Sequence, residues 1–218
     1  MTNLIIKVFR KIPKHSYLLF GIFLFVFVFP MLSSFGKGGL LISISYSIML
    51  LSVGAIIESK KRWMYILIFI AVILQWIVHM LSYKEFPFLN YISFAFTLGV
   101  FIIATFLMIH QIIRSKRVDS KLIIETIIGY LLIGVIFTLI NVLIISLNLE
   151  AIGFTTDKPN LTEIIYYSFI TVTTIGFGDI SPVSPVARSF AILFGLIGQL
   201  YLTIIIAFII GKFLNKKD

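Results

Sequence analysis

Long apolar runs dominate this sequence and restrict what it can fold into. Hydrophobic residues make up 60% of the 218-residue chain and charged residues only 12%, whereas roughly 45–50% of the residues in a soluble domain are apolar. A helix that crosses a membrane needs about 20 mostly apolar residues, so the sequence predicts an all-α membrane protein with six transmembrane helices. These are Tyr17–Ser33, Gly39–Ile57, Trp63–Leu81, Tyr91–Ile113, Leu122–Asn148 and Ser189–Leu214.

The basic residues are distributed unevenly between the two sides of these helices. With the N-terminus inside, only Lys37, Lys84, Lys158 and Arg188 of the 18 Lys and Arg residues fall outside. Basic residues concentrate in cytoplasmic segments, so we expect a multi-pass protein of the cell membrane with both termini in the cytoplasm. The net charge of +9 then reflects topology and not nucleic-acid binding, and it is compatible with contact to anionic lipid headgroups.

The segment between the fifth and sixth helices has a different character. Asn160 is placed to cap a short helix, with Glu163 three residues later as in a capping box. The helical run Leu161–Thr173 is too short to span a membrane, and Gly176 and Gly178 end it. A short helix followed by a glycine-containing return predicts a re-entrant loop. Such irregular backbone is tolerated at membrane depth only beside protein or a water-filled cavity, so the loop indicates a pore or a substrate cavity.

The loop Thr171–Asp179 resembles the signature of potassium channels, whose filter reads Thr-Val-Gly-Tyr-Gly. The resemblance implies stacked K⁺ sites made by the backbone carbonyls of Thr174, Ile175, Gly176 and Phe177, with Gly178 and Asp179 at the outer end. It also implies support from the pore helix by Tyr167, Thr171 and Thr173. K⁺ is the permeant ion, and no cofactor is expected.

The filter chemistry explains the glycine spacing. Successive carbonyls face one side only if the backbone alternates between ordinary and left-handed conformations, and glycine adopts the latter at little cost. Gly176 and Gly178 occupy alternate positions, which turns the side chains of Ile175 and Phe177 away from the axis to pack behind the filter. One chain supplies one loop, so four chains must surround the pore as a cyclic homotetramer.

Further positions extend the resemblance over about Leu122–Leu214. Tyr166-Tyr167-Ser168 is similar to the aromatic-aromatic-Ser pattern of the family's pore helix. Arg188 matches a basic residue at the start of the inner helix, and Gly198 aligns with the gating hinge of that helix.

Three positions depart from the family pattern. Phe177 replaces the commoner Tyr and lacks its hydroxyl, Ile170 stands where many members have a Glu, and Tyr167 stands where a Trp is common. The filter is therefore expected to be less braced, with more inactivation or looser selectivity. We hypothesise that the Tyr167 hydroxyl pairs with Asp179.

The chain is expected to divide into a four-helix membrane domain, residues 1–120, and a pore domain, residues 121–218. The first resembles a voltage-sensor domain without its charges, because Tyr91–Ile113 contains no Lys or Arg. A sensor needs such charges in its fourth helix, so weak or absent voltage dependence is predicted. Glu125, an acid near the start of the fifth helix, is expected to pair with Lys121 or Arg117.

The favoured function is passive, K⁺-selective conduction, and two alternatives stay open. One is a channel that also passes Na⁺, and the other is a non-conducting regulatory subunit that assembles with a longer channel. An enzyme is not expected, because no paired acids, catalytic triad or metal cluster lies within the membrane segments. Few residues follow Leu214, so a gating signal is expected to act on the membrane part or through a separate regulatory protein.

Overall fold

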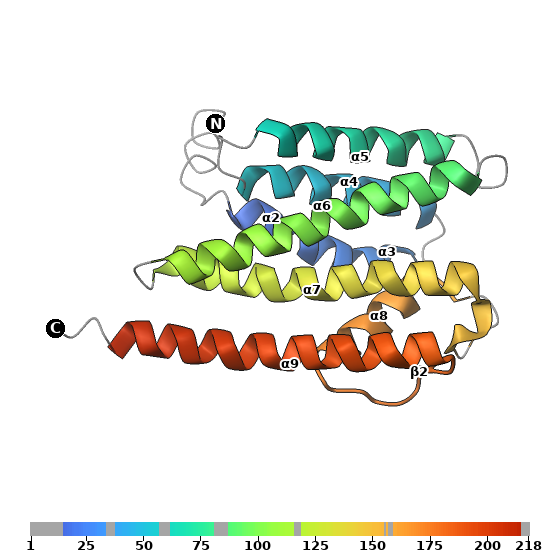
Figure 1. The fold of residues 1–218 in the computed structure, drawn as a ribbon. Helices are drawn as coiled ribbons and strands as arrows, with labels where there is room; N and C mark the ends of the chain where they lie inside the picture. The colour runs from blue at the N-terminus through green and yellow to red at the C-terminus, as the bar shows by residue number, and fades with distance from the viewer. Residues whose placement is uncertain are drawn as a thin grey trace. The chain divides into compact units, whose positions relative to one another are not determined.

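The computed structural model describes residues 15–33, 38–56, 62–80, 87–115, 119–154, 156 and 159–214, nearly all of them helical (Figure 1). The chain divides into two compact units, one drawn from residues 1–100 and 119–125 and the other from residues 101–118 and 126–218. Many of the basic residues behind the topology prediction, including Lys37, Lys84 and Lys158, lie outside the described residues. The position of Arg117 lies outside them too.

The first unit contains three apolar helical segments and the first part of a fourth. The elements are α2 (His15–Phe23), η1 (Leu24–Val28), α3 (Phe29–Ser33), α4 (Gly38–Ile56), α5 (Arg62–Met80) and α6 (Pro87–Arg114) up to Val100. The turns of η1 are π-helical and lead directly into the segment with Pro30. Proline has no N–H to donate and its ring crowds the preceding turn, and a local π-helix accommodates such an interruption.

Helix α4 packs against both α2 and α5 within this unit. Gly21 lets α2 approach closely, since an added Cβ would lie 3.3 Å from the Met49 Cα. Two hydrogen bonds join α4 and α5: Trp76 Nε1 donates to Ser47 Oγ at 3.0 Å, and Gln75 Nε2 donates to the Ser43 carbonyl at 3.1 Å. Polar side chains in an apolar helix pair therefore find partners across the interface.

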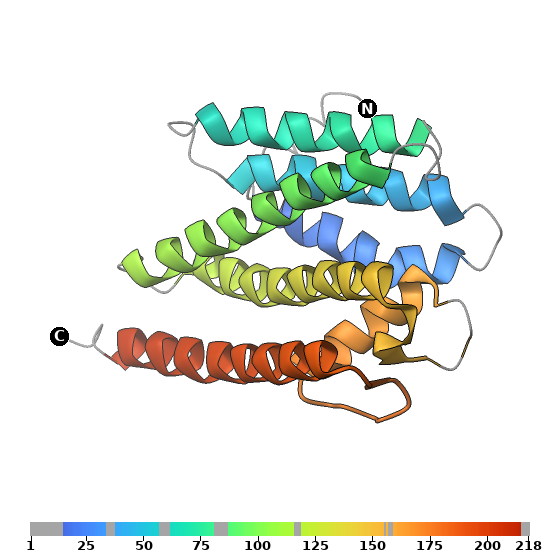
Figure 2. The same cartoon turned by 45° about the vertical axis from the view of Figure 1, so that its right-hand side comes forward.

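The second unit contains the end of α6, most of α7 and everything that follows. The further elements are α7 (Ser120–Leu147), η2 (Leu149–Ala151), β1 (Ile152–Gly153), α8 (Leu161–Val172), β2 (Ser181–Pro182) and α9 (Pro185–Leu214). In both views α8 lies against α7 and α9, and the loop after it returns to β2 (Figures 1 and 2). The strands pair antiparallel, with Ile152 opposite Pro182.

Three of the described helices are long and apolar enough to cross a membrane: Phe88–Arg114, Lys121–Leu147 and Pro185–Lys212. Shorter apolar helical segments cover Ser16–Leu32, Ser43–Gly54, Trp63–Val78 and Leu161–Val172. The mostly helical, membrane character expected from the apolar runs is thus confirmed, and α8 has the short length expected of a pore helix.

Candidate pore and filter

The start of α8 has the predicted cap. The Asn160 side chain accepts the Glu163 N–H at 3.0 Å, and a Glu163 carboxylate oxygen accepts the Asn160 N–H at 3.0 Å. This reciprocal pair satisfies two of the N–H groups that a helix leaves free at its first turn. The capping box predicted from the sequence is therefore confirmed, and it fixes the first residue of α8.

A buried polar contact ties the middle of α8 to α7. Asn141 Nδ2 donates to Ser168 Oγ at 2.9 Å, and Ser168 Oγ donates to the Ile164 carbonyl at 2.7 Å. Beside it, the Phe137 ring stacks on Phe194 of α9 at a centroid distance of 4.5 Å and lies 6.0 Å from the Tyr167 ring. α7, α8 and α9 therefore meet in one packed layer behind the filter loop.

The chain reverses direction immediately after α8 through backbone hydrogen bonds. The Thr173 N–H donates to the Phe169 carbonyl at 2.9 Å. The Ile175 and Gly176 N–H groups both donate to the Ile170 carbonyl, at 3.0 and 3.1 Å. The carbonyls at the end of a helix have no partner within the helix, so the loop uses them as its anchor.

The loop backbone alternates as the glycine spacing predicts. Thr174 has φ +60°, Gly176 has φ +50° and Gly178 has φ +81°. Thr174 is the one non-glycine residue with positive φ in the described part of the chain. A β-branched residue rarely adopts this conformation, and such strain concentrates at functional sites. Every second residue from Thr174 to Gly178 is therefore left-handed, the alternation that lets successive carbonyls face one side.

The same loop is exposed on all sides in the single chain. Phe177 is 72% and Ile175 57% exposed, and an added Cβ on Gly176 or Gly178 would meet no atom within 4 Å. The packing of Ile175 and Phe177 that was expected behind the filter is thus not made within this chain.

Asp179, at the outer end of the loop, pairs with Tyr166. The Tyr166 hydroxyl donates to Asp179 Oδ2 at 2.8 Å, and this hydrogen bond raises the pKa of the Tyr166 phenol. The hypothesis that Tyr167 makes this contact is wrong: its hydroxyl is buried and is not the partner of Asp179. Neighbouring helix residues point about 100° apart, and only the one on the loop side reaches the carboxylate.

The return from the filter is held by three hydrogen bonds that sequence reasoning missed. The Ala151 carbonyl accepts the N–H groups of Val183 and Ser184, at 2.9 and 3.0 Å. Arg188 Nε donates to the Pro182 carbonyl at 3.2 Å. The strands involved are two residues long, too short to leave a periodic pattern in the sequence. Arg188, expected only as a basic residue at the start of α9, therefore fastens that helix to the filter return.

Gly198 lies where α9 meets the end of α8. A Cβ added at Gly198 would overlap the Val172 carbonyl oxygen, whereas one added at Gly195 would lie 3.9 Å from its nearest neighbour, the Thr171 carbonyl oxygen. Helix α9 runs unbroken through both positions. Close approach of the backbone is thus a sufficient reason for glycine at 198, and its role as a gating hinge stays a prediction.

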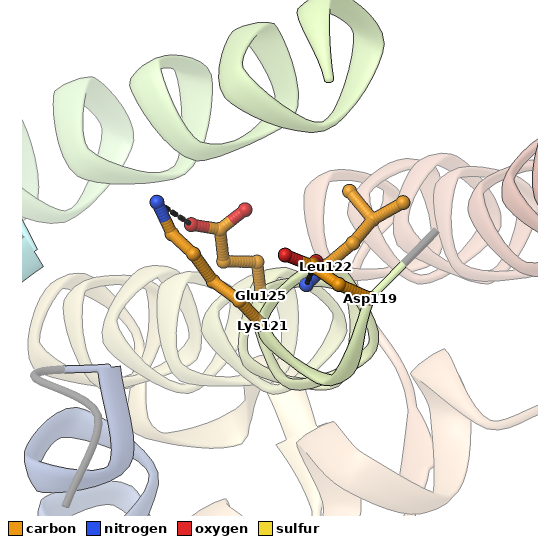
Figure 3. A network of polar contacts seen from close by, with 4 residues as sticks. All are labelled: Asp119, Lys121, Leu122 and Glu125. Carbon is orange, nitrogen blue, oxygen red and sulfur yellow. Dashed lines mark hydrogen bonds and ion pairs between the residues drawn. The ribbon is translucent and has the colours of Figure 1, made fainter. Parts of the chain in front are cut away.

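The start of α7, in the first unit, carries a small charged network (Figure 3). Asp119 Oδ1 accepts the Leu122 N–H at 2.9 Å, in the manner of a helix N-cap. Lys121 Nζ lies 3.7 Å from Glu125 Oε1, one turn further along the helix. The expected pairing of Glu125 with Lys121 is therefore confirmed, and the acid is held at the helix entrance by a lysine whose side chain is exposed.

Comparison with known proteins agrees with this arrangement. Residues 125–215 match a family model described as ion channel. The chain is 30% identical over 104 residues, 48% of its length, to two-pore potassium channel 2 of Arabidopsis thaliana. It is 31% identical over 84 residues to two-pore potassium channel 5 of the same plant, and 33% identical over 58 residues to two pore potassium channel c of Oryza sativa subsp. japonica.

The chain spans only part of these relatives, namely 23%, 20% and 13% of their respective lengths. No solved structure gives a significant match. The family model covers most of α7, α8, the loop after it and all of α9, and it indicates a channel and not an enzyme. The chain is thus similar to an ion channel family over residues 125–215, and to plant potassium channels over up to 104 residues.

Proposed function

We propose that this chain is one subunit of a homotetrameric channel that conducts K⁺ passively across the cell membrane. The observation that carries the proposal is the left-handed backbone at Thr174, Gly176 and Gly178, directly after a capped helix too short to span. A dehydrated K⁺ ion needs oxygen ligands that replace its water shell, and stacked carbonyls provide them. The proposed ligands are the carbonyls of Thr174, Ile175, Gly176 and Phe177.

The exposure of the loop supports assembly around an axis. Large apolar side chains on a filter loop and on a membrane helix need protein or lipid around them, and irregular backbone cannot face lipid. Beyond Phe177 and Ile175, exposed apolar side chains run along α9, among them Ile192, Leu196, Leu200, Ile204 and Ile206. Three further copies of the chain would cover the loop and leave its carbonyls facing a shared axis.

The membrane arrangement follows from the same reasoning. We propose that α2–α3, α4 and α5 are spans in addition to the three longer helices, with both termini cytoplasmic and the pore domain beginning near residue 121. Lipid surrounds the tetramer, and anionic headgroups are the expected neighbours of the basic cytoplasmic segments. Helix α6 carries no Lys or Arg before Arg114, its last residue, which supports weak or absent voltage dependence.

Potassium flux into proteoliposomes tests the function. The wild-type chain is expected to let an external K⁺ tracer enter K⁺-loaded proteoliposomes down the electrochemical gradient of the tracer, and bi-ionic reversal potentials distinguish a K⁺-selective pore from one that also passes Na⁺. A folded protein without flux that alters the current of a longer channel indicates the regulatory-subunit alternative.

A further inference from the structure

The last carbonyl of α8 is held differently from those before it. Phe169, Ile170 and Thr171 each present a carbonyl that accepts backbone N–H groups from the loop. The Val172 carbonyl instead accepts the Tyr130 hydroxyl of α7, at 3.2 Å. Val172 is two residues from Thr174, where the left-handed backbone begins, so a side chain from another helix holds the inner end of the loop.

Tyr130 is itself held by the inner helix. Its ring stacks on Tyr201 of α9, with 5.9 Å between centroids and 27° between planes. The Tyr201 hydroxyl donates to the Thr126 carbonyl at 2.8 Å. Gly129 leaves room for that hydroxyl, since a Cβ there would overlap it. The two tyrosines therefore form one packed and hydrogen-bonded unit between α7 and α9.

The inner helix touches the same carbonyl from a second direction. Gly198, one turn before Tyr201, lies so close to the Val172 carbonyl oxygen that no Cβ fits between them. A rigid contact on one side and the Tyr130 hydroxyl on the other fix that carbonyl in place. A displacement of α9 around residues 198–201 must move the Tyr201 ring, the Tyr130 ring, or the end of α8 itself.

We propose that Tyr130 and Tyr201 are positioning residues that transmit the position of the inner helix to the inner end of the filter. Neither touches the permeant ion. The Tyr130 hydroxyl orients the Val172 carbonyl and thereby Thr173 and Thr174, and Tyr201 keeps the Tyr130 ring in register with α9. This inference rests on the proposed channel function and assigns it a route from α9 to the K⁺ sites.

The test compares Tyr130→Phe and Tyr201→Phe, which remove one hydroxyl each and keep the rings, with the double variant. Tyr91→Phe, an exposed tyrosine of α6, is the matched control. The first readout is the K⁺ concentration that gives half of the K⁺-dependent thermal stabilisation of the purified protein, with Na⁺ as the reference ion, since a ligand stabilises according to its own affinity. The second is the K⁺/Na⁺ reversal potential in bilayers.

Tyr130→Phe is expected to raise the half-maximal K⁺ concentration by about two- to tenfold, the range that corresponds to one net hydrogen bond. Tyr201→Phe is expected to shift it in the same direction by less. The double variant is expected to shift it no further than Tyr130→Phe alone, because Tyr201 acts on the Val172 carbonyl only through Tyr130. 4-Aminophenylalanine at position 130 supplies a donor again and is expected to restore the wild-type value. A change limited to stability, equal in K⁺ and Na⁺, would show a merely structural role and overturn the proposal.

The outcomes separate this inference from the function on which it rests. A wild type with neither K⁺ flux nor K⁺-dependent stabilisation overturns the channel function, and the inference with it. A conducting wild type with an unaltered Tyr130→Phe, or with additive effects of the two substitutions, overturns the inference alone. If Tyr130→Phe does not assemble, the proposal is tested with Tyr201→Phe alone. An unchanged half-maximal K⁺ concentration in that variant contradicts the proposal.

Discussion

The Tyr166 hydroxyl donates a hydrogen bond to Asp179 across the filter loop, joining the middle of the pore helix to the outer mouth at 2.8 Å. Ile170 provides no carboxylate, and among the described residues this contact is the one hydrogen bond between α8 and the Asp179 side chain. The outer end of the loop therefore depends on Tyr166. The neighbouring Tyr167 has the same side chain, but it does not reach Asp179.

Tyr166→Phe is expected to accelerate inactivation of the K⁺ current at the outer mouth, because Asp179 loses its hydrogen-bond donor. Tyr167→Phe is the matched control, since its hydroxyl does not reach Asp179. Current decay during sustained activation in planar bilayers measures the difference. Equal decay rates in Tyr166→Phe and wild type would count against the brace.

Gly198→Ala is expected to destabilise the assembled protein by about 1–3 kcal/mol, the usual cost of overpacking, because the new Cβ overlaps the Val172 carbonyl. Gly195→Ala is the control in the same helix, and its Cβ meets only ordinary contacts. That substitution is expected to be neutral or to gain up to about 1 kcal/mol of helix propensity. Thermal unfolding in detergent compares them, and a Gly198→Ala protein as stable as Gly195→Ala would indicate a hinge without close packing.

The Asn141–Ser168 hydrogen bond is expected to contribute about 0.6–1.7 kcal/mol, as measured for hydrogen bonds between membrane helices. A double-mutant cycle with Asn141→Leu and Ser168→Ala isolates this coupling in the free energy of unfolding. Strict additivity would mean that the two side chains act independently and that α8 is positioned by apolar packing alone.

Asn160→Ala is expected to cost about 1 kcal/mol, the usual loss for an N-cap, and to shorten α8 at its start. Asn160→Asp retains an acceptor for the Glu163 N–H and is expected to preserve stability. The unfolding midpoints of the two variants are compared. An equal loss of stability in both variants would contradict the role of Asn160 as the cap.

The sequence predicted those parts of the site that local chemistry decides. The spacing of Asn160 and Glu163 predicts a helix cap from the local sequence alone. Gly176 and Gly178 mark positions where the backbone can adopt positive φ without strain. Thr174 could not be predicted as left-handed, because a β-branched residue disfavours that conformation and only the anchoring of the following N–H groups on the Ile170 carbonyl imposes it.

The contacts between residues far apart in the chain could not be predicted from the sequence for a related reason. The choice between Tyr166 and Tyr167 depends on the rotation of α8 about its axis, and the contacts of Tyr130 with Val172 and Tyr201 join three helices far apart in the chain. Apolar patterning predicts that these helices are buried in a membrane. It carries little information about the rotation of α7 and α9, because these two helices are apolar on nearly every side.

The central claim is that Thr171–Asp179 is a K⁺ filter, and Gly176→Ala tests it most directly. Gly176 has φ +50° and open space around it within the single chain, so an added methyl strains the backbone by about 1–2 kcal/mol without a clash inside its own chain. The measurement is K⁺ uptake into proteoliposomes at matched protein content. The wild-type protein is expected to give K⁺ flux, and Gly176→Ala is expected to lose most of that flux. Equal flux in the two proteins would contradict the filter assignment.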